Sequence, residues 1–296
     1  GTGQKGTRLD FISFHTKGGG YGREPTAPKK TPCLATLFGH IHAGLDIIAG
    51  FPALRRHEVI LSECDPDGWA AGTIADNRNL FYRNTEYYAG FVAAAACELA
   101  VSAHAQGPRA DGMLTWAFQF EGRELFAGSR ALSTNGIDKP VLNVLRLLGR
   151  LGSVRCGMTI GRNEAHGEPK RGTAAPTIRG LATVDAFERL HVLLCSHHDD
   201  WDVAGTTEIR MTVSGLREQG YAVTQWRIDR HHANAHTTWQ EMGEPRPPTE
   251  EQRRALKAAA RLHATPAGLV AADDGILQVA VSLPAHAVCL IELVPT

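Results

Sequence analysis

The sequence has no excess of charge of either sign. Its 31 Lys and Arg residues are matched by 31 Asp and Glu residues, and no basic run stands out. A nucleic-acid-binding protein usually carries a basic patch or stripe, so we expect no nucleic-acid partner. Long apolar runs are missing too, because none approaches the roughly 20 residues that span a bilayer. We therefore expect a soluble protein with no membrane partner; the chain opens with no apolar leader, which leaves its compartment open.

Motifs for metal binding and redox chemistry are also missing. The six cysteines are widely spaced and form no CxxC pair, so we predict free thiols at Cys33, Cys64, Cys97, Cys156, Cys195 and Cys289. The histidine-rich stretches 197–200 and 231–236 match no recognised zinc spacing, and we interpret them as surface turns. We therefore expect neither a metal nor another cofactor.

A carboxylate stands at the end of a predicted buried strand near residue 60. Val59–Leu61 is a short apolar run with β-branched residues, and Ser62 and Glu63 follow it before a Cys-Asp-Pro-Asp-Gly turn. Helical stretches flank the strand at Cys33–Ala53 and Thr85–Gln106. In β/α units, active residues gather at the carboxyl ends of the strands. Glu63 is therefore the first candidate for chemistry, with a solvated turn residue as the alternative.

Two further strands of this kind are predicted in the first half of the chain. Leu9–Phe14 and Met113–Phe118 are apolar runs, each followed by polar residues. Pro32 fits the first turn of the first helix, and Pro140 opens a third helix at Val141–Leu151. These segments give three β/α units, whereas a closed (β/α)8 barrel takes about 250 residues.

The pattern changes near residue 152. Short runs that alternate apolar and polar residues, or are β-branched, replace the helical stretches, as is typical of a β-sandwich. One helix, at Thr249–Arg261, interrupts them. We predict an α/β domain in residues 1–152 and an all-β domain in residues 153–296. The predicted strands of the second domain are Ile178–Val184, Leu190–Cys195, Glu208–Val213, Ala222–Ile228, Ile276–Val281 and Ala287–Leu293.

Several separated blocks of the sequence resemble glycoside hydrolase family 39, which holds β-xylosidases and α-L-iduronidases, in both order and spacing. They are LDFISFHTKGG, VILSECDPDGW, YRNTEYYAGFV, LTWAFQF, NGIDKPVLNVLRLLGRLG and HANAHTTWQEMGEPRPPTEEQ. The resemblance implies that residues 1–152 are the C-terminal units, six to eight, of the family's (β/α)8 TIM barrel, followed by a β-sandwich. The first five units have no counterpart here, so we expect the N-terminal half of the barrel from a longer chain or a second chain.

The same resemblance implies a retaining glycosidase, which needs two carboxyl groups about 5 Å apart. Glu63 aligns with the family's nucleophile at the end of the seventh strand. The family's acid/base follows an Asn at the end of the fourth strand, which is missing here, and the pair Asn163-Glu164 falls in a polar loop after the barrel. We therefore expect no acid/base residue in this chain. A non-catalytic carbohydrate-binding relative is the alternative from another class.

Residues near the predicted nucleophile bear on the sugar. The family places a sugar-binding histidine at His15, and iduronidase-like sequences place a lysine at Lys17 that meets a substrate carboxylate, as charge-assisted hydrogen bonding favours. Gly68 and Trp69 follow the nucleophile as in iduronidases, in a loop one residue shorter. Asp138 stands where iduronidases carry an Arg, and a carboxylate facing the pocket would repel a uronic acid.

Aromatic residues end the third predicted strand. Trp116 is our choice for stacking on the sugar, whereas Phe118 is as readily barrel core, because alternate residues of one strand cannot all face the pocket. Glu121 matches, loosely, a family carboxylate that hydrogen-bonds sugar hydroxyls. Cys64, beside Glu63, allows a Cys-His-Asp nucleophile, but no motif supports one.

These observations predict a retaining, exo-acting β-D-xylosidase that releases terminal xylose from small xylo-oligosaccharides through a covalent glycosyl-enzyme intermediate. An α-L-iduronidase-like enzyme is the alternative within the class. Lys17 favours that alternative, and Asp138 disfavours it.

Overall fold

The computed structural model describes residue 6 and residues 8–101, 107–161 and 175–296. In this part of the chain, we find no helix with the length and apolar character needed to cross a membrane.

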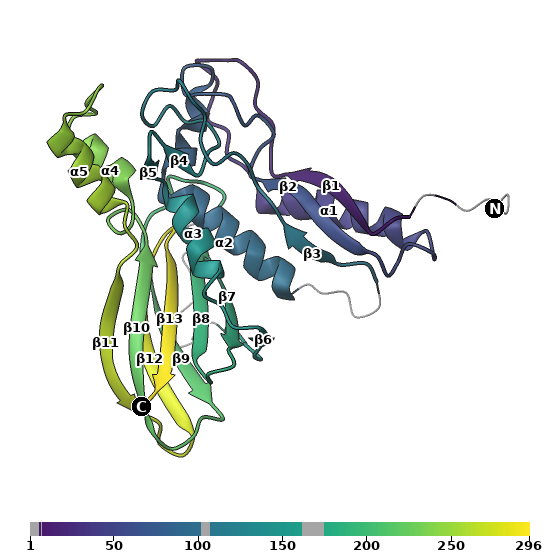
Figure 1. The fold of residues 1–296 in the computed structure, drawn as a ribbon, viewed down its shortest axis with the longest axis vertical. Coiled ribbons are helices and arrows are strands. Elements are labelled where there is room, and N and C mark those ends of the chain that lie inside the picture. The colour runs from purple at the N-terminus through teal and green to yellow at the C-terminus, as the bar shows by residue number, and fades with distance from the viewer. Residues whose placement is uncertain (1–5, 7, 102–106, 162–174) are drawn as a thin grey trace.

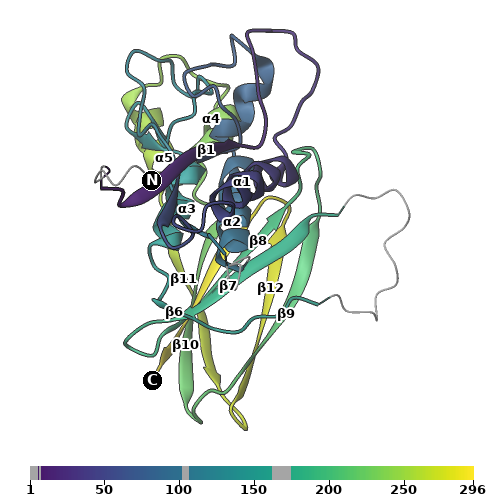
Figure 2. The ribbon, with the colours of Figure 1, turned by 90° about the vertical axis from the view of Figure 1, so that its right-hand side faces the viewer.

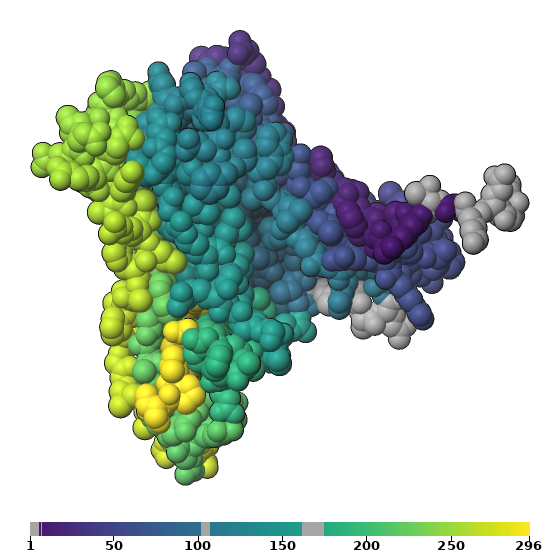
Figure 3. Space-filling view, viewed as in Figure 1, coloured from purple at the N-terminus to yellow at the C-terminus, as the bar shows by residue number. Residues whose placement is uncertain are grey.

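The first half of the chain forms a three-stranded parallel sheet with helices between its strands. The strands are β1 (Phe11–Lys17), β2 (Glu58–Asp65) and β3 (Ala110–Met113), and β2 lies in the middle. The helices are α1 (Leu34–Ala49), α2 (Glu86–Val101) and α3 (Pro140–Leu148), which follow β1, β2 and β3 in turn. The predicted order of three strand–helix units is confirmed. In the space-filling view, the β1 region projects from the rest of the molecule (Figure 3).

Two helices bury their apolar residues in different ways. The buried residues of α1 recur every three or four positions, so that one stripe faces the sheet; they are Leu34, Leu37, Ile41, Leu45 and Ile48. Helix α2 is Ala-rich and buried over most of its length, because it packs against α3 on one side and against strands of the second half on another. It therefore joins the two halves of the molecule (Figure 1).

The pairing of β1 with β2 shifts by one residue just before the strands end. Phe14 pairs with Leu61, but the next residue, His15, pairs with Glu63, so Ser62 has no partner on β1. This irregularity is a β-bulge. Two polar side chains, His15 and Glu63, consequently face each other at the end of the strands.

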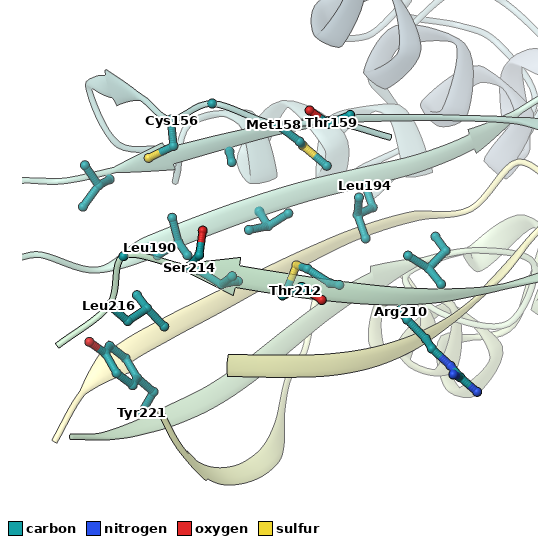
Figure 4. Close-up of a pocket in the computed structure, with 18 of the residues that line it drawn as sticks. Cys156, Met158, Thr159, Leu190, Leu194, Arg210, Thr212, Ser214, Leu216 and Tyr221 are labelled. Atoms are coloured by element: carbon teal, nitrogen blue, oxygen red, sulfur yellow. The ribbon is translucent and has the colours of Figure 1, made fainter. Parts of the chain in front are cut away.

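The second half forms two antiparallel sheets that extend away from the helices (Figure 2). The first sheet has the strand order β11-β10-β13-β8-β7-β6, and the second pairs β9 with β12. An apolar cluster lies between them, together with a mostly apolar cavity of about 610 Å³ (Figure 4). The strands are β6 (Val154–Arg155), β7 (Thr177–Val184), β8 (Leu190–His197), β9 (Thr206–Ser214), β10 (Gly220–Ile228), β11 (Ala264–Ala271), β12 (Ile276–Pro284) and β13 (Val288–Pro295).

Short elements complete the described fold. They are the 3-10 helix η1 (Arg78–Asn84), the strands β4 (Ser133–Thr134) and β5 (Ile137–Asp138), and the helices α4 (Ala235–Glu241) and α5 (Glu250–Ala259). Thr249 caps α5 as expected, since its side chain and that of Gln252 bond reciprocally to each other's backbone N–H.

Some predicted boundaries are wrong. The third strand, Ala110–Met113, shares only Met113 with the predicted strand Met113–Phe118, because the chain beyond Leu114 turns to pair with the 130–133 segment. Pro32 lies outside α1, whose N-cap is Cys33. Sequence reasoning also missed α4 and β11, since α4 is only seven residues long and the pattern of β11 is weakly apolar and exposed.

Candidate active site

Glu63 lies at the carboxyl end of β2 with three basic side chains around its carboxylate. Lys17 Nζ is 2.6 Å from Oε2, and Arg130 Nη2 is 3.3 Å from the same oxygen. His15 Nδ1 is 3.6 Å from the other oxygen, Oε1. Because β1 and β2 are parallel neighbours, their carboxyl ends bring His15, Lys17 and Glu63 to one edge of the sheet.

A second carboxylate, Asp65, shares two of these cations with Glu63. Its Oδ2 is 2.5 Å from Lys17 Nζ and 3.0 Å from Arg130 Nη1, and Thr115 Oγ1 donates to Oδ1 at 2.5 Å. The side chains of Asp65 and Arg130 are almost completely buried. Each cation thus bridges two carboxylates, and this network holds Glu63 in one orientation.

The electrostatics of the site keep Glu63 ionised. Burial raises the pKa of Glu63, but hydrogen bonding by Lys17 and Trp116 and the positive charges of Lys17 and His15 outweigh burial, so that the pKa falls to about 2. For Asp65 the balance differs: burial raises its pKa although Arg130 and Lys17 lower it. Glu63 is therefore the carboxylate of this pair that is suited to nucleophilic attack.

The turn after β2 is held by a buried ion pair between Asp67 and Arg83. Arg83 Nε is 3.0 Å from Asp67 Oδ2, and Nη2 contacts the other carboxylate oxygen. Burial would raise the pKa of Asp67, but the charge and hydrogen bonds of Arg83 hold it below its usual value. Arg83 also donates to the backbone oxygen of Trp69 at 2.7 Å, and a Cβ added at Gly68 would lie 3.8 Å from Lys17 Cγ. Both predicted loop residues therefore lie next to the charged network.

The predicted aromatic and acidic residues of the third unit differ in their distance from the charged network. Trp116 is half exposed, with the Arg130 guanidinium 5.8 Å from its ring centroid, and its indole reaches Glu63. Phe118 is exposed rather than core. Glu121 is exposed, and no described hydrogen bond or ion pair joins it to Glu63. The structure thus brings Trp116, but not Glu121, to the network.

The interpretation of both histidine-rich stretches as surface turns is wrong in part. His197 ends β8 and is buried, because α2 covers it with Tyr87, whose ring centroid is 5.1 Å away. His236 is buried in α4 against Phe126, with 5.2 Å between ring centroids. Within the described ranges, no three His, Cys, Asp or Glu side chains are arranged to hold a metal ion.

The alternative nucleophile, Cys64, is buried beside Glu63. Burial raises the pKa of its thiol to about 11, so the thiol is protonated near neutral pH and the reactive thiolate is scarce. All six cysteines are free, as predicted. The pair Asn163-Glu164 lies outside the described residues.

Sequence reasoning missed four charged residues of the site. Asp65 and Asp67 stand two and four positions after Glu63, so their closeness to it was a usable signal. Arg83 and Arg130 carry no such signal, because the contacts that bury them join residues far apart in the sequence.

A glutamate is thus held ionised by cations at the carboxyl ends of parallel strands, which is where α/β folds carry their active residues. The chain belongs to glycosyl hydrolases family 39, whose family model matches residues 3–275. A search of curated proteins found no match.

Solved structures of the family share this fold. The bacterial orthologue of human α-L-iduronidase matches all of this chain with 24% identity and a TM-score of 0.78, over 50% of its own length. The family 39 enzyme from Xanthomonas axonopodis pv. citri matches 98% of this chain with 18% identity and a TM-score of 0.70, over 55% of its length. A monomeric β-xylosidase from Caulobacter crescentus CB15 matches 98% with 18% identity and a TM-score of 0.69, over 56%. The chain thus spans about half the length of these structures.

Proposed function

We propose that this chain carries the nucleophile of a retaining, exo-acting glycosidase, and that the nucleophile is Glu63. The supporting observation is an ionised carboxylate whose Oε2 is occupied by Lys17 and Arg130, while Oε1 lies near the exposed His15. Oε1 is therefore the oxygen that attacks the anomeric carbon as the bond to the leaving oxygen breaks. Water then attacks the same carbon and releases Glu63, so that the configuration is retained.

The proton for the leaving oxygen must come from a second carboxyl group. The described residues contain no carboxyl group that faces Glu63 without being tied to a cation. We therefore propose that residues 1–152 are units six to eight of a TIM barrel, that a β-sandwich follows, and that the acid/base lies in the remaining units. Alternate residues of β1, namely Phe11, Ser13 and His15, are exposed, which supports this arrangement, since parallel sheets are normally covered on both faces.

For the sugar, the charges around Glu63 favour a uronide. Lys17 and Arg130 converge beside the nucleophile, and such cations suit the carboxylate of a uronic acid. The sequence argument against a uronide is weakened, because Asp138 pairs with Arg146 of α3, with 2.7 Å between Oδ2 and Nη1. We propose an α-L-iduronidase-like specificity.

A β-D-xyloside is the second candidate. The observation that favours it is that both cations already pair with Glu63 and Asp65, so a sugar without a charged substituent would leave the network undisturbed. β-D-Xylosides and α-L-iduronides share the ring configuration at the reacting centre, so one nucleophile can serve both.

The test uses the natural protein that contains this chain and activated aryl glycosides of both sugars. We expect a higher kcat/KM for the α-L-iduronide, and we expect Lys17→Met to lower that value far more than the value for the β-D-xyloside. A 2-deoxy-2-fluoro glycosyl fluoride of the preferred sugar should add one sugar mass to the Glu63 peptide. A label on another residue would exclude Glu63 as the nucleophile. If Lys17→Met lowered kcat/KM equally for both glycosides, the proposed preference for a uronide would be wrong.

A further inference from the structure

A lysine with no carboxylate partner is buried beneath the candidate site. Lys139 precedes Pro140 at the start of α3, and its side chain is 1% exposed. Within the described ranges, no carboxylate lies within ion-pair distance of its Nζ, which donates instead to the backbone oxygen of Ser129 at 2.9 Å. Burial, and then the nearby charge of Arg83, lower the pKa of Lys139 to about 7. Burying such a group costs free energy, so a specific use is expected.

The acceptor of this hydrogen bond belongs to the peptide unit that leads into Arg130. The C=O end of that unit, on Ser129, accepts from Lys139, and its N–H end, on Arg130, donates to the backbone oxygen of Ala70 at 2.8 Å. The preceding carbonyl, on Gly128, accepts from Arg83 Nη1 at 3.0 Å. Two buried basic side chains therefore hold two successive carbonyls, and the plane of the peptide before Arg130 is fixed at both ends.

The direction in which Arg130 leaves the backbone depends on that plane. Its guanidinium then reaches Glu63 Oε2 at 3.3 Å and Asp65 Oδ2 at 3.0 Å, and it also donates to the backbone oxygen of Asp67. A rotation of the peptide would turn the Cα–Cβ bond of Arg130 and displace the guanidinium from these oxygens. Such displacements are costly at a catalytic site, where a shift of about 1 Å can lower the rate about a hundredfold.

A direct chemical role for the Lys139 amine does not fit its surroundings. The cavity that Lys139 lines has a volume of about 10 Å³, which is no more than one water molecule needs. No glycoside can reach the amine there. Its contribution must pass through the groups that it holds.

We propose that Lys139 is a positioning residue of the glycosidase site. It fixes the Ser129–Arg130 peptide, so that the Arg130 guanidinium keeps its contact with the carboxylate of the nucleophile Glu63. This inference rests on the proposed function. The same chemistry predicts that the effect of Lys139 on turnover disappears when Arg130 has no guanidinium to position.

The test is a double-mutant cycle on the natural protein that contains this chain. Lys139→Met keeps an unbranched side chain as far as Cε but removes the amine donor, and we expect kcat/KM to fall by about tenfold to a hundredfold. In an Arg130→Met background, the same change should lower kcat/KM little further, because coupled residues are not additive. Lys257→Met, the same substitution at an exposed position of α5, is the matched control and should be silent. The inference would be overturned if Lys139→Met lowered kcat/KM by the same factor in the parent protein and in Arg130→Met. It would also be overturned if Lys139→Met kept the parent kcat/KM.

A second readout separates this inference from the proposed function. A 13C NMR titration of the Glu63 carboxyl group in this chain needs no turnover. Lys139→Met should raise the pKa of Glu63 when Arg130 is present and leave it unchanged when Arg130 is Met. If the parent protein turns over no glycoside but this coupling is seen, the proposed function fails and the positioning role stands; if turnover is seen without the coupling, the positioning role fails.

Discussion

Two clusters of buried polar side chains differ in how completely they are paired. Around Glu63, almost every buried charge meets an opposite charge or a hydrogen-bond partner, with Asp67 bound to Arg83 and Asp65 to Arg130. Between α2 and the β-sheets, the rings of His197 and His286 lie with their centroids 5.6 Å apart, and their ring nitrogens make no hydrogen bond of normal length. The nearest carboxylate oxygen, Asp199 Oδ1, is 3.6 Å from His197 Nε2. Pairing therefore decides which form of a buried group is stable: charged in the first cluster, neutral in the second.

The two clusters consequently respond to acid in different pH ranges. Burial lowers the pKa of His286 to about 4, so above that value the folded protein keeps this ring neutral. Glu63 keeps its charge down to its pKa of about 2. A fall in pH should therefore protonate His286 before it protonates Glu63.

The largest effect is expected at the nucleophile. Glu63→Gln should lower turnover of an activated aryl glycoside by about a thousandfold or more, because the amide cannot form the covalent intermediate, while the fold persists. Steady-state kinetics of the natural protein, with circular dichroism as the check on folding, measure both. Glu121→Gln, at an exposed position outside the network, should keep parent activity. Retained activity in Glu63→Gln would exclude Glu63 as the nucleophile.

Breaking a pair in the first cluster should cost stability. Arg83→Met leaves Asp67 buried without its counter-ion, which should lower the free energy of unfolding by about 3–5 kcal/mol. Urea denaturation of this chain measures the change. Arg217→Met removes the exposed partner of Glu188 and should cost less than about 1 kcal/mol. If both variants lost a similar free energy of unfolding, the buried Arg83–Asp67 pair would contribute no more to stability than an exposed pair.

The second cluster should make stability depend on pH between about 6.5 and 4. In this range the unfolded state binds a proton at His286 and the folded state does not, so stability is full above about 6.5 and falls as the pH is lowered. This residue should contribute a loss of up to about 2 kcal/mol between pH 7 and pH 5.

His286→Asn should reduce that loss, and Asn tolerates the positive φ of 62° at this position. Urea denaturation at pH 7 and pH 5 measures the difference in the free energy of unfolding between the two pH values. His231→Asn, at an exposed site, is the control and should keep the difference seen in the parent protein. An unchanged difference in His286→Asn would mean that this ring does not limit stability in acid.

The smallest effect is expected at Asp138. Its ion pair with Arg146 is partly exposed, so Asp138→Asn should change the free energy of unfolding by less than about 1 kcal/mol. Since Asp138 faces α3, the variant should also keep the parent kcat/KM for an α-L-iduronide. A marked gain in kcat/KM would show that Asp138 repels the substrate carboxylate after all.

Local pattern predicted most of the first half of the fold. The apolar stripe of α1 and the run at Val59–Leu61 each follow from a few consecutive residues, so their type and order were predictable. The rule that active residues of β/α units gather at the carboxyl ends of the strands predicted that His15 and Glu63 would lie at neighbouring strand ends. The end of β3 was not predictable, because it depends on pairing with a segment more than ten residues away.

Long-range burial explains what sequence reasoning missed in the site. Arg130 and Lys139 look like ordinary loop residues in the sequence, yet the fold buries both completely. His197 looks like part of a polar turn and is covered only because α2 packs over the end of β8. Burial of a charged or polar residue by a distant segment leaves no periodic signal, so these positions required the structure.

The bulge at Ser62 has a consequence for insertions and deletions. If Ser62 were held in regular pairing without the bulge, strict alternation along β2 would send Glu63 to the face of Leu61, and Cys64 would turn away from the core cluster that it now shares with Leu61. Deletion of Ser62 would instead give one continuous register in which Glu63 still faces His15 and Cys64 stays on the face of Leu61. A gap of one residue at this position in a related sequence is therefore compatible with a carboxylate beside His15.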